Sequence, residues 1–411
     1  MVEWLVAPCG VRRKDTDMTR DMTRLMRRTL GVGVTGALAV TALIVPAPAA
    51  RAAGITAGEQ EYYSYYSLDS IHNAGYRGAG VTIGLIDGPI NTNIPELNGA
   101  NIHNMSRCTV NSTDNHWDHG SVIAQVLVSP AFGVAPDAAL YSYTLSFKGE
   151  STEADCAIGD WTRGKSDAAL LIEYALNDGV DVVSISSSYP GDYDVMRWAL
   201  ARAIVRQVPV VVSMGNEATY DYPDTLARMS GVIGVSAIET NGSMSDYSNY
   251  GNYVSTAALG RPYARRGVTA ELWNWWGTSF ASPTVAGSLA LAKQRWPNAT
   301  GNQIMQGLTH TGVGSDGNSW NPFTGYGALN TYALMTTSPM SYPDQNPFMN
   351  KGYNSTPTRQ DVLDYADGVA DPSQIYADGD YEYRGFDESI AFSGRHSYPT
   401  HLGTSPRYHR K

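Results

Sequence analysis

The distribution of apolar residues divides the central part of the chain, residues 62–333, into short apolar runs and longer segments with helical spacing. Residues 81–86, 180–186, 208–213 and 232–237 are short runs rich in β-branched apolar residues, which predicts strands buried on both faces. Residues 167–177 and 284–294 have helical spacing, and a glycine or a proline follows each of them. Strands that alternate with helices predict an α/β fold with a mainly parallel sheet.

The first 52 residues have a different pattern. Arg24, Arg27 and Arg28 precede an uncharged apolar run of 16 residues, 30–45, and Ala50-Arg51-Ala52 follows it. A basic flank, an apolar stretch and small residues in this order are typical of a secretory signal peptide. We therefore assign residues 1–52 to a leader and signal peptide, with cleavage after Ala52 and a secreted, extracellular product. The alternative is a membrane anchor, although a spanning helix needs about 20 apolar residues.

Beyond the leader, residues 53–411 carry 35 acidic side chains against 21 basic ones, a net charge of −14. Such an acidic chain repels nucleic acids and anionic membranes, so neither is an expected partner. Cys108 and Cys156 remain in this part of the chain. In an oxidising compartment an even pair of cysteines predicts one disulfide, and two unrelated buried thiols are the alternative.

The composition changes at about residue 339. Residues 339–411 are poor in aliphatic runs and rich in Asp, Tyr, Gly and Pro, which predicts no core. We therefore assign residues 53–338 to one globular domain and residues 339–411 to a polar, poorly ordered extension. Asp378-Gly379-Asp380 lacks the further ligands that a calcium loop needs. The sequence thus requires no cofactor and does not support structural calcium.

Ser279 is a candidate nucleophile at the start of an apolar helix. Unpaired backbone N–H groups at a helix start can help to hold negative charge. Gly277 and Ala281 permit close approach to the hydroxyl, and Pro283 suits a first helical turn. A serine before a helix is more often a cap, which is the alternative for this residue taken alone.

Three other polar residues could supply the base, the acid and the oxyanion donor that a serine nucleophile needs. His119 is expected near the start of an apolar helix. Asp87 and Asn216 each follow a strand, at the carboxyl edge where open parallel sheets place functional groups. Taken singly, the histidine could be a packed side chain, and Asp87 and Asn216 could form turns. A metal centre is not predicted, because no His-Glu-x-x-His helix occurs and His116 and His119 lack a third ligand.

Together these segments resemble the subtilisin-like serine proteases, the subtilases, over about residues 62–333 and in the family order Asp, His, Asn, Ser. Gly277-Thr278-Ser279-Phe280-Ala281-Ser282-Pro283-Thr284-Val285-Ala286-Gly287 is close to the family's nucleophile signature. Shorter matches are residues 81–87 for the Asp strand, 118–124 for the His helix, 214–216 for the oxyanion segment, 181–186 for the strand that pairs with substrate, and 325–327 near the end of the domain.

The resemblance implies a three-layer sandwich around a mainly parallel, roughly seven-stranded sheet. It also implies that Ser279 attacks the scissile carbonyl, that His119 transfers the proton and that Asp87 orients the imidazole. Asn216 would donate to the oxyanion. The residues implied to bind the substrate are Ser186, Ser187, Ser188 and Gly215.

The chain departs from the family pattern around this site. The usual Asp-Ser/Thr-Gly is Asp87-Gly88-Pro89, which lacks the hydroxyl beside the acid. Val122 replaces a second histidine, and Gln125 replaces the glycine that usually follows Ala124. Ser187-Ser188-Tyr189 stands in place of Leu-Gly-Gly, which predicts a smaller or more polar specificity pocket.

These observations predict a secreted, monomeric serine endopeptidase whose partner is a polypeptide substrate. Two alternatives stay open. One is a catalytically weak or inactive homologue that binds peptides, which the altered surroundings of Asp87 and His119 favour. The other is a processing protease dedicated to one secreted partner.

Overall fold

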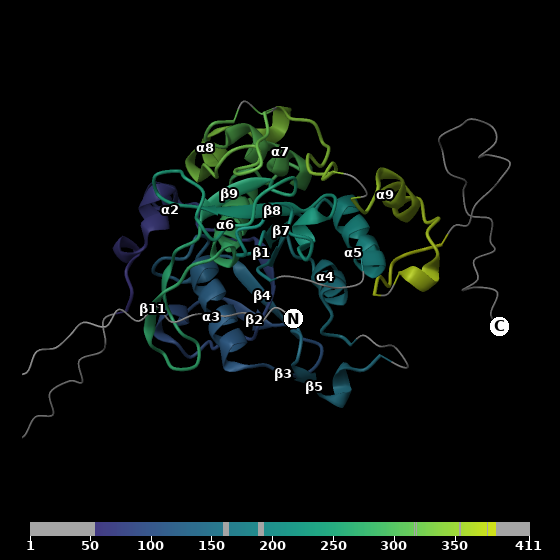
Figure 1. The fold of residues 1–411 in the computed structure, drawn as a ribbon, viewed down its shortest axis with the longest axis horizontal. Helices are drawn as coiled ribbons and strands as arrows, with labels where there is room; N and C mark the ends of the chain where they lie inside the picture. The colour runs from purple at the N-terminus through teal and green to yellow at the C-terminus, as the bar shows by residue number, and fades with distance from the viewer. Residues whose placement is uncertain are drawn as a thin grey trace, which may run out of the picture. The chain divides into compact units, whose positions relative to one another are not determined.

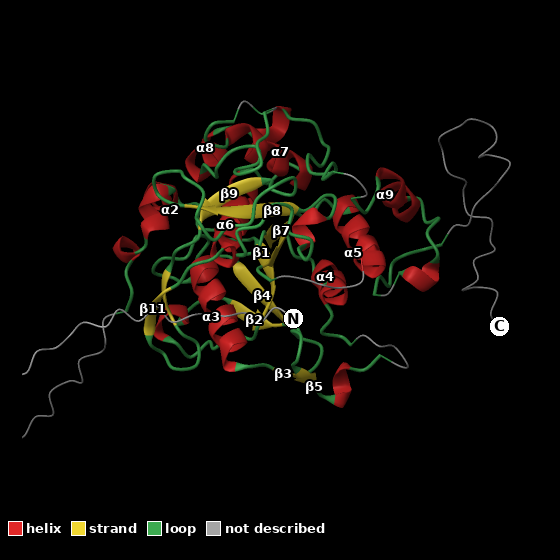
Figure 2. Ribbon diagram, viewed as in Figure 1, coloured by secondary structure: helices red, strands yellow, loops and turns green. Residues whose placement is uncertain are grey.

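The central sheet consists of seven parallel strands in the order β2-β4-β1-β6-β7-β8-β9 (Figures 1 and 2). The computed structural model describes residues 54–158, 164–187, 193–315, 317, 319–352, 355–375 and 377–383. The strands, in sheet order, are β2 Ile102–Asn104, β4 Ala139–Thr144, β1 Thr82–Asp87, β6 Val182–Ile185, β7 Val210–Ser213, β8 Ile233–Ile238 and β9 Thr256–Leu259.

The strands contribute side chains to two apolar cores, one on each face of the sheet. On β1, Ile83 and Leu85 lie in the core that includes α3 (Asp114–Val128) and α6 (Thr278–Arg295). Ile86 lies in the core that includes α4 (Ala168–Asn177) and α5 (Tyr193–Val205). Burial on both faces explains why these strands are apolar at successive positions. The predicted α/β fold, with helices on both sides of a parallel sheet, is confirmed.

Nine α-helices lie within the described residues. They are α1 Glu61–Tyr65, α2 Leu68–Asn73, α3 Asp114–Val128, α4 Ala168–Asn177, α5 Tyr193–Val205, α6 Thr278–Arg295, α7 Gly301–Thr311, α8 Thr331–Thr336 and α9 Arg359–Ala366. None of these helices has the length and apolar character that crossing a membrane requires.

Helices α3 and α6 begin earlier than the apolar pattern predicts. α3 starts at Asp114, so His119 lies in its second turn rather than at its start. α6 starts at Thr278, directly after Gly277, whose φ of 145° favours glycine. Pro283 therefore lies inside α6 and not in its first turn. Because proline has no N–H, Pro283 leaves the carbonyl of Ser279 without its usual helical donor.

Two short hairpins lie outside the main sheet. β3 (Val110–Asn111) pairs with β5 (Ser151–Thr152), and β10 (Tyr263–Arg265) pairs with β11 (Leu272–Asn274). The predicted disulfide between Cys108 and Cys156 is present and joins the segments that carry the first hairpin.

The described part of the extension is folded, unlike the poorly ordered segment expected from its composition. It contains η5 (Pro339–Ser341), α9 and η6 (Pro372–Gln374), and α9 packs against α5 (Figure 1). Trp198 and Ala201 of α5 form a small core with Tyr365, Ala370, Ile375 and Tyr381. This core escaped prediction because Trp198 and Ala201 of α5 complete it, and because the four residues that the extension contributes are spread along the chain and form no apolar run.

A buried charged cluster also attaches the extension to the domain. The fully buried Arg202 of α5 pairs with Glu173 of α4 and lies 3.2 Å from Asp378 of the extension. Asp378 also accepts a hydrogen bond from the hydroxyl of Tyr365. The carboxylate of Asp378 is therefore engaged by this cluster.

Candidate active site

Asp87 and His119 lie side by side at the carboxyl edge of the sheet. The Nδ1 of His119 is 2.7 Å from Oδ1 of Asp87, which is the last residue of β1. The carboxylate is fully buried, whereas 24% of the imidazole side chain is exposed. Since Nδ1 faces the carboxylate, the second ring nitrogen, Nε2, is the one left for proton transfer to other groups.

The close approach of β1 to α3 depends on two glycines. A Cβ atom on Gly88 would lie 2.1 Å from the carbonyl oxygen of His116, and one on Gly120 would lie 2.3 Å from the carbonyl oxygen of Gly88. The departure at Gly88 is therefore part of the packing that brings Asp87 to His119. The Oδ2 of Asp87 is buried without a hydrogen-bond partner among the described residues.

The electrostatics of this pair favour a protonated imidazole. Burial by itself would lower the pKa of His119, but the charge of Asp87 and its hydrogen bond outweigh burial and raise the pKa above its ordinary value. The raised pKa is typical of a histidine that accepts a proton and is stabilised by a carboxylate as it does so.

Asn216 is fixed to the first residue of α6. Its Oδ1 accepts hydrogen bonds from the backbone N–H of Thr278 at 2.8 Å and from the hydroxyl of Thr278 at 3.0 Å. The Thr278 hydroxyl oxygen also accepts from the N–H of Gly215 at 3.0 Å. Because the carbonyl side of the Asn216 amide is held in this way, its Nδ2 donor has a defined direction beside α6.

Ser279 lies between residues that contact the other site members. Its preceding neighbour Thr278 bonds to Asn216, and its following neighbour Phe280 has its ring 5.7 Å from the ring of His119. Ser279 itself is 7% exposed, in the first turn of α6. The structure thus brings the four predicted residues, Asp87, His119, Asn216 and Ser279, into one locality.

Of the four residues expected to bind the substrate, the structure describes Ser186, Ser187 and Gly215. Ser186 and Ser187 follow β6, and the hydroxyl of Ser186 bonds to that of Ser282 at 2.9 Å. Gly215 carries the backbone N–H that bonds to Thr278. Ser188 lies outside the described residues.

Sequence reasoning missed a set of contacts that fix the β10–β11 hairpin to α3. The side-chain amide of Gln125 makes two hydrogen bonds to the backbone of Arg265, at 2.7 Å to its carbonyl and at 3.0 Å from its N–H. Gln125 is fully buried, and its replacement of the usual glycine was the available signal. The Arg265 guanidinium also makes a bidentate pair with the buried Glu96.

A second anchor joins the same hairpin to α3 directly beside His119. The buried Asp118 pairs with the guanidinium of Arg266 at 2.6 Å and accepts from the N–H of Val268 at 2.8 Å. The hairpin therefore has a fixed position relative to the helix that carries His119.

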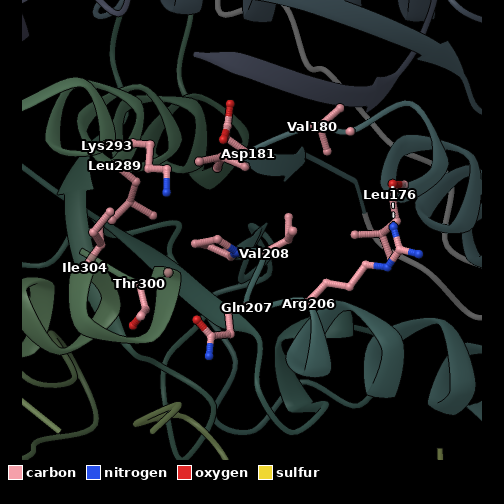
Figure 3. A pocket seen from close by; sticks show the side chains of 14 residues that line it. Leu176, Val180, Asp181, Arg206, Gln207, Val208, Leu289, Lys293, Thr300 and Ile304 are labelled. Atoms are coloured by element: carbon pink, nitrogen blue, oxygen red, sulfur yellow. Dashed lines mark hydrogen bonds between the residues drawn. The ribbon is translucent and has the colours of Figure 1, made fainter. Parts of the chain in front are cut away.

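A pocket of about 510 Å³ lies elsewhere in the molecule (Figure 3). Asp181, Val182, Val208 and Pro209 line it, at the beginnings of β6 and β7. Since β1, β6 and β7 are parallel, this pocket is at the edge of the sheet opposite to Asp87. It is separate from the candidate active site.

The subtilase family profile matches residues 78–327, which include Asp87, His119, Asn216 and Ser279. The chain belongs to the subtilase family. As a subtilase it is a serine-type endopeptidase. The match covers more than half of the chain and ends before residue 339, so it does not include the extension.

Two curated relatives illustrate this membership. Subtilisin DY from Bacillus licheniformis is 28% identical over 253 residues, which are 59% of this chain and 87% of that protein. The thermostable alkaline protease of Halalkalibacterium halodurans is 29% identical over 256 residues, 60% of this chain and 66% of that protein.

The solved structures show likeness of fold. The prenylagaramide maturation protease PagA has a TM-score of 0.53 at 19% identity, covering 66% of this chain and 97% of that one. MycP1 from Mycobacterium smegmatis has a TM-score of 0.57 at 22% identity, covering 73% of this chain and 90% of that one. Both agree with the three-layer subtilisin-like fold.

Proposed function

We propose that this subtilase is a secreted endopeptidase in which Ser279, His119 and Asp87 form the catalytic triad and Asn216 donates to the oxyanion. The observation that carries the proposal is the 2.7 Å bond between His119 and Asp87. Ser279 lies on α6, and the ring of the next residue, Phe280, lies beside the ring of His119. The family supports polypeptides as the substrate class. No cofactor enters the proposed chemistry.

The proposed reaction has two steps. The Oγ of Ser279 attacks the peptide carbonyl carbon and its proton passes to Nε2 of His119, while Nδ2 of Asn216 stabilises the negative oxygen. His119 then protonates the leaving amine, the C–N bond breaks and an ester on Ser279 remains. Water adds to this ester by the same proton transfers, which releases the acid and restores Ser279.

Secretion is supported by the order of basic, apolar and small residues in residues 24–52. A disulfide between Cys108 and Cys156 is consistent with an oxidising compartment. Expression of the full chain in a secreting host, followed by N-terminal sequencing of the medium, tests this part. Mature protein beginning at Ala53 is the expected result, and protein that stays uncleaved in the cell would contradict it.

The triad is tested with a fluorophosphonate that labels activated serines. We expect the wild type to be labelled, Ser279→Ala to remain unlabelled and His119→Ala to react far more slowly, because the hydroxyl is then not activated. Ser64→Ala, which alters an exposed serine of α1, is the matched control and should label like the wild type. A folded wild type that takes up no label would refute the catalytic proposal in favour of a peptide-binding homologue.

The substrate range requires a separate measurement. Digestion of a broad peptide library, read by mass spectrometry, distinguishes a general endopeptidase from one dedicated to a single partner. We expect cleavage of many sequences, and a digest that leaves most peptides intact would instead indicate a processing protease.

A further inference from the structure

The β10–β11 hairpin presents large apolar side chains to solvent beside the active site. Trp273 of β11 is 48% exposed, and the neighbouring Leu272 is 37% exposed. The hairpin returns directly to Gly277 and to the nucleophile helix α6, and Figure 1 shows β11 close to α3. Trp273 is the most exposed tryptophan that the structure describes, and tryptophan is enriched where proteins bind partners.

The exposed Trp273 lies on the same face of the hairpin as an aromatic row that leads to His119. The N–H of Trp275 bonds to the carbonyl of Pro262, so strand pairing continues one residue beyond β11. Residues two apart on a strand share a face, which places Trp273 and Trp275 together. The Trp275 ring is 5.8 Å from that of Phe280, and Phe280 is 5.7 Å from His119.

The anchors to α3 hold this face in a fixed position. The Asp118–Arg266 pair lies one residue from His119, and the Gln125–Arg265 and Glu96–Arg265 contacts hold the adjoining strand. A rigid aromatic side chain loses little conformational freedom when it binds, so its contact area contributes efficiently to affinity. The hairpin thus has the properties of a preformed binding element.

We propose that the face of the β10–β11 hairpin that carries Trp273 binds the leaving-group side of the polypeptide substrate, and that Trp273 contacts an apolar or aromatic side chain there. The inference rests on the proposed function, in which His119 protonates the leaving amine. That part of the substrate must therefore lie next to His119, and the aromatic row extends outward from His119 to Trp273.

Two substrates separate this role from general effects on the site. One is a peptide anilide with no amino acid after the scissile bond, and the other is an internally quenched peptide with phenylalanines after it. For Trp273→Ala we expect kcat/KM for the quenched peptide to fall about 5- to 30-fold, mostly through KM, as for loss of one apolar contact. Turnover of the anilide should be unchanged, and Trp273→Phe should recover most of the loss.

Tyr332→Ala is the matched control, because Tyr332 is an equally exposed aromatic residue on α8. This substitution should leave the cleavage rates of both substrates unchanged. An equal fall for both substrates with Trp273→Ala would indicate a structural role and overturn the proposal, as would no change for the quenched peptide. Sedimentation that shows a wild-type dimer dissociated by Trp273→Ala would assign the face to a second copy instead. A wild type that cleaves neither substrate would refute the proposed function itself.

Discussion

The carboxylate of Asp87 is completely buried against an imidazole of His119 that is still partly exposed, and a 2.7 Å hydrogen bond joins Oδ1 of Asp87 to Nδ1 of His119. One oxygen of Asp87 bonds to His119 and to the N–H of Gly88, whereas the other has no partner among the described residues. A buried carboxylate with an unsatisfied oxygen gains strongly from a positive charge nearby. This arrangement favours the protonated state of His119.

The first prediction concerns the pH dependence of turnover. His119 acts as a base only when it is neutral, and Asp87 raises its pKa above the ordinary value of 6.5. We therefore expect kcat/KM to rise with pH through a midpoint above 6.5. Asp87→Asn should move that midpoint downward and reduce turnover by roughly 10⁴-fold, because the charge that stabilises the imidazolium is lost. A rate that stays flat from about pH 5 to 8 would exclude His119 as the base.

The second prediction concerns the oxyanion donor. Asn216→Ala should lower kcat by about 100- to 1000-fold with little change in KM, because the donor acts mainly in the transition state. Thr278→Val keeps the shape but removes the hydroxyl that bonds to Asn216, so a smaller fall of about 2- to 10-fold is expected. Steady-state kinetics on one peptide anilide measure both variants. Equal losses in the two variants would show that Thr278 does more than position the amide.

The parts of this structure that the sequence predicts are those determined by local pattern. Runs rich in β-branched apolar residues gave the strands β1, β6, β7 and β8, because burial on both faces favours apolar side chains at successive positions. The strand boundaries in the structure differ from the predicted ones by up to two residues. β6, for example, is Val182–Ile185, whereas the prediction was residues 180–186. The motif residues Asp87, His119 and Asn216 were found because each follows a strand or lies in a recognisable segment.

The parts that escaped prediction depend on pairs of residues far apart in the chain. The partner of Gln125 is the backbone of Arg265, 140 residues away, and no local pattern reveals it. The core of the extension likewise depends on Trp198 of α5 packing against Tyr365. Composition alone therefore made residues 339–383 look unable to fold.

The third prediction tests the buried pair that anchors the hairpin. Glu96 is nearly inaccessible and Arg265 is mostly buried, so Glu96→Gln leaves a buried guanidinium without its counter-charge. We expect the free energy of unfolding to fall by about 3–5 kcal/mol. Arg77→Ala is the control, because the Arg77–Asp137 pair is exposed and should contribute less than about 1 kcal/mol. Urea unfolding measures both, and equal effects would mean that the Glu96 pair does not support the fold.

The fourth prediction concerns Glu173 in the charged cluster that attaches the extension. Burial raises the pKa of Glu173 to about 7, and the charge of Arg202 only partly opposes this. A carboxyl whose pKa is higher in the folded state stabilises the fold fully below its unfolded value, 4.5, and this contribution is lost as pH rises through about 7. The Gln side chain of Glu173→Gln is neutral at every pH. As the pH rises from 4.5 to about 7, the melting temperature of this variant should therefore fall less than that of the wild type.

Glu61→Gln provides the comparison for Glu173, because Glu61 lies exposed on α1. Its melting temperature should follow the wild type at every pH. If Glu173→Gln also follows the wild type, Glu173 does not take up a proton on folding. Melting followed by circular dichroism at several pH values decides between these outcomes.

The fifth prediction concerns Lys351, a buried lysine in the extension. Its Nζ donates to the carbonyl of Tyr253 at 2.8 Å and to the hydroxyl of Ser255 at 2.6 Å, and no carboxylate pairs with it among the residues that the structure describes. Burial lowers the pKa of Lys351 from 10.5 to about 7. The unfolded chain therefore binds an additional proton between these two values.

Lys351 and Glu173 change the stability in opposite directions as the pH rises. Stability rises with pH wherever the unfolded state binds more protons, so the wild type should gain up to roughly 4 kcal/mol between about pH 7 and 10.5. Lys351→Met removes this gain, and its stability relative to the wild type should be greatest below pH 7. Lys293→Met, at a partly exposed position on α6, is the control and should keep the wild-type slope. Urea unfolding between about pH 7 and 10.5 measures the slope of stability against pH. If Lys351→Met has the same slope as the wild type, the Lys351 amine stays charged in the folded state.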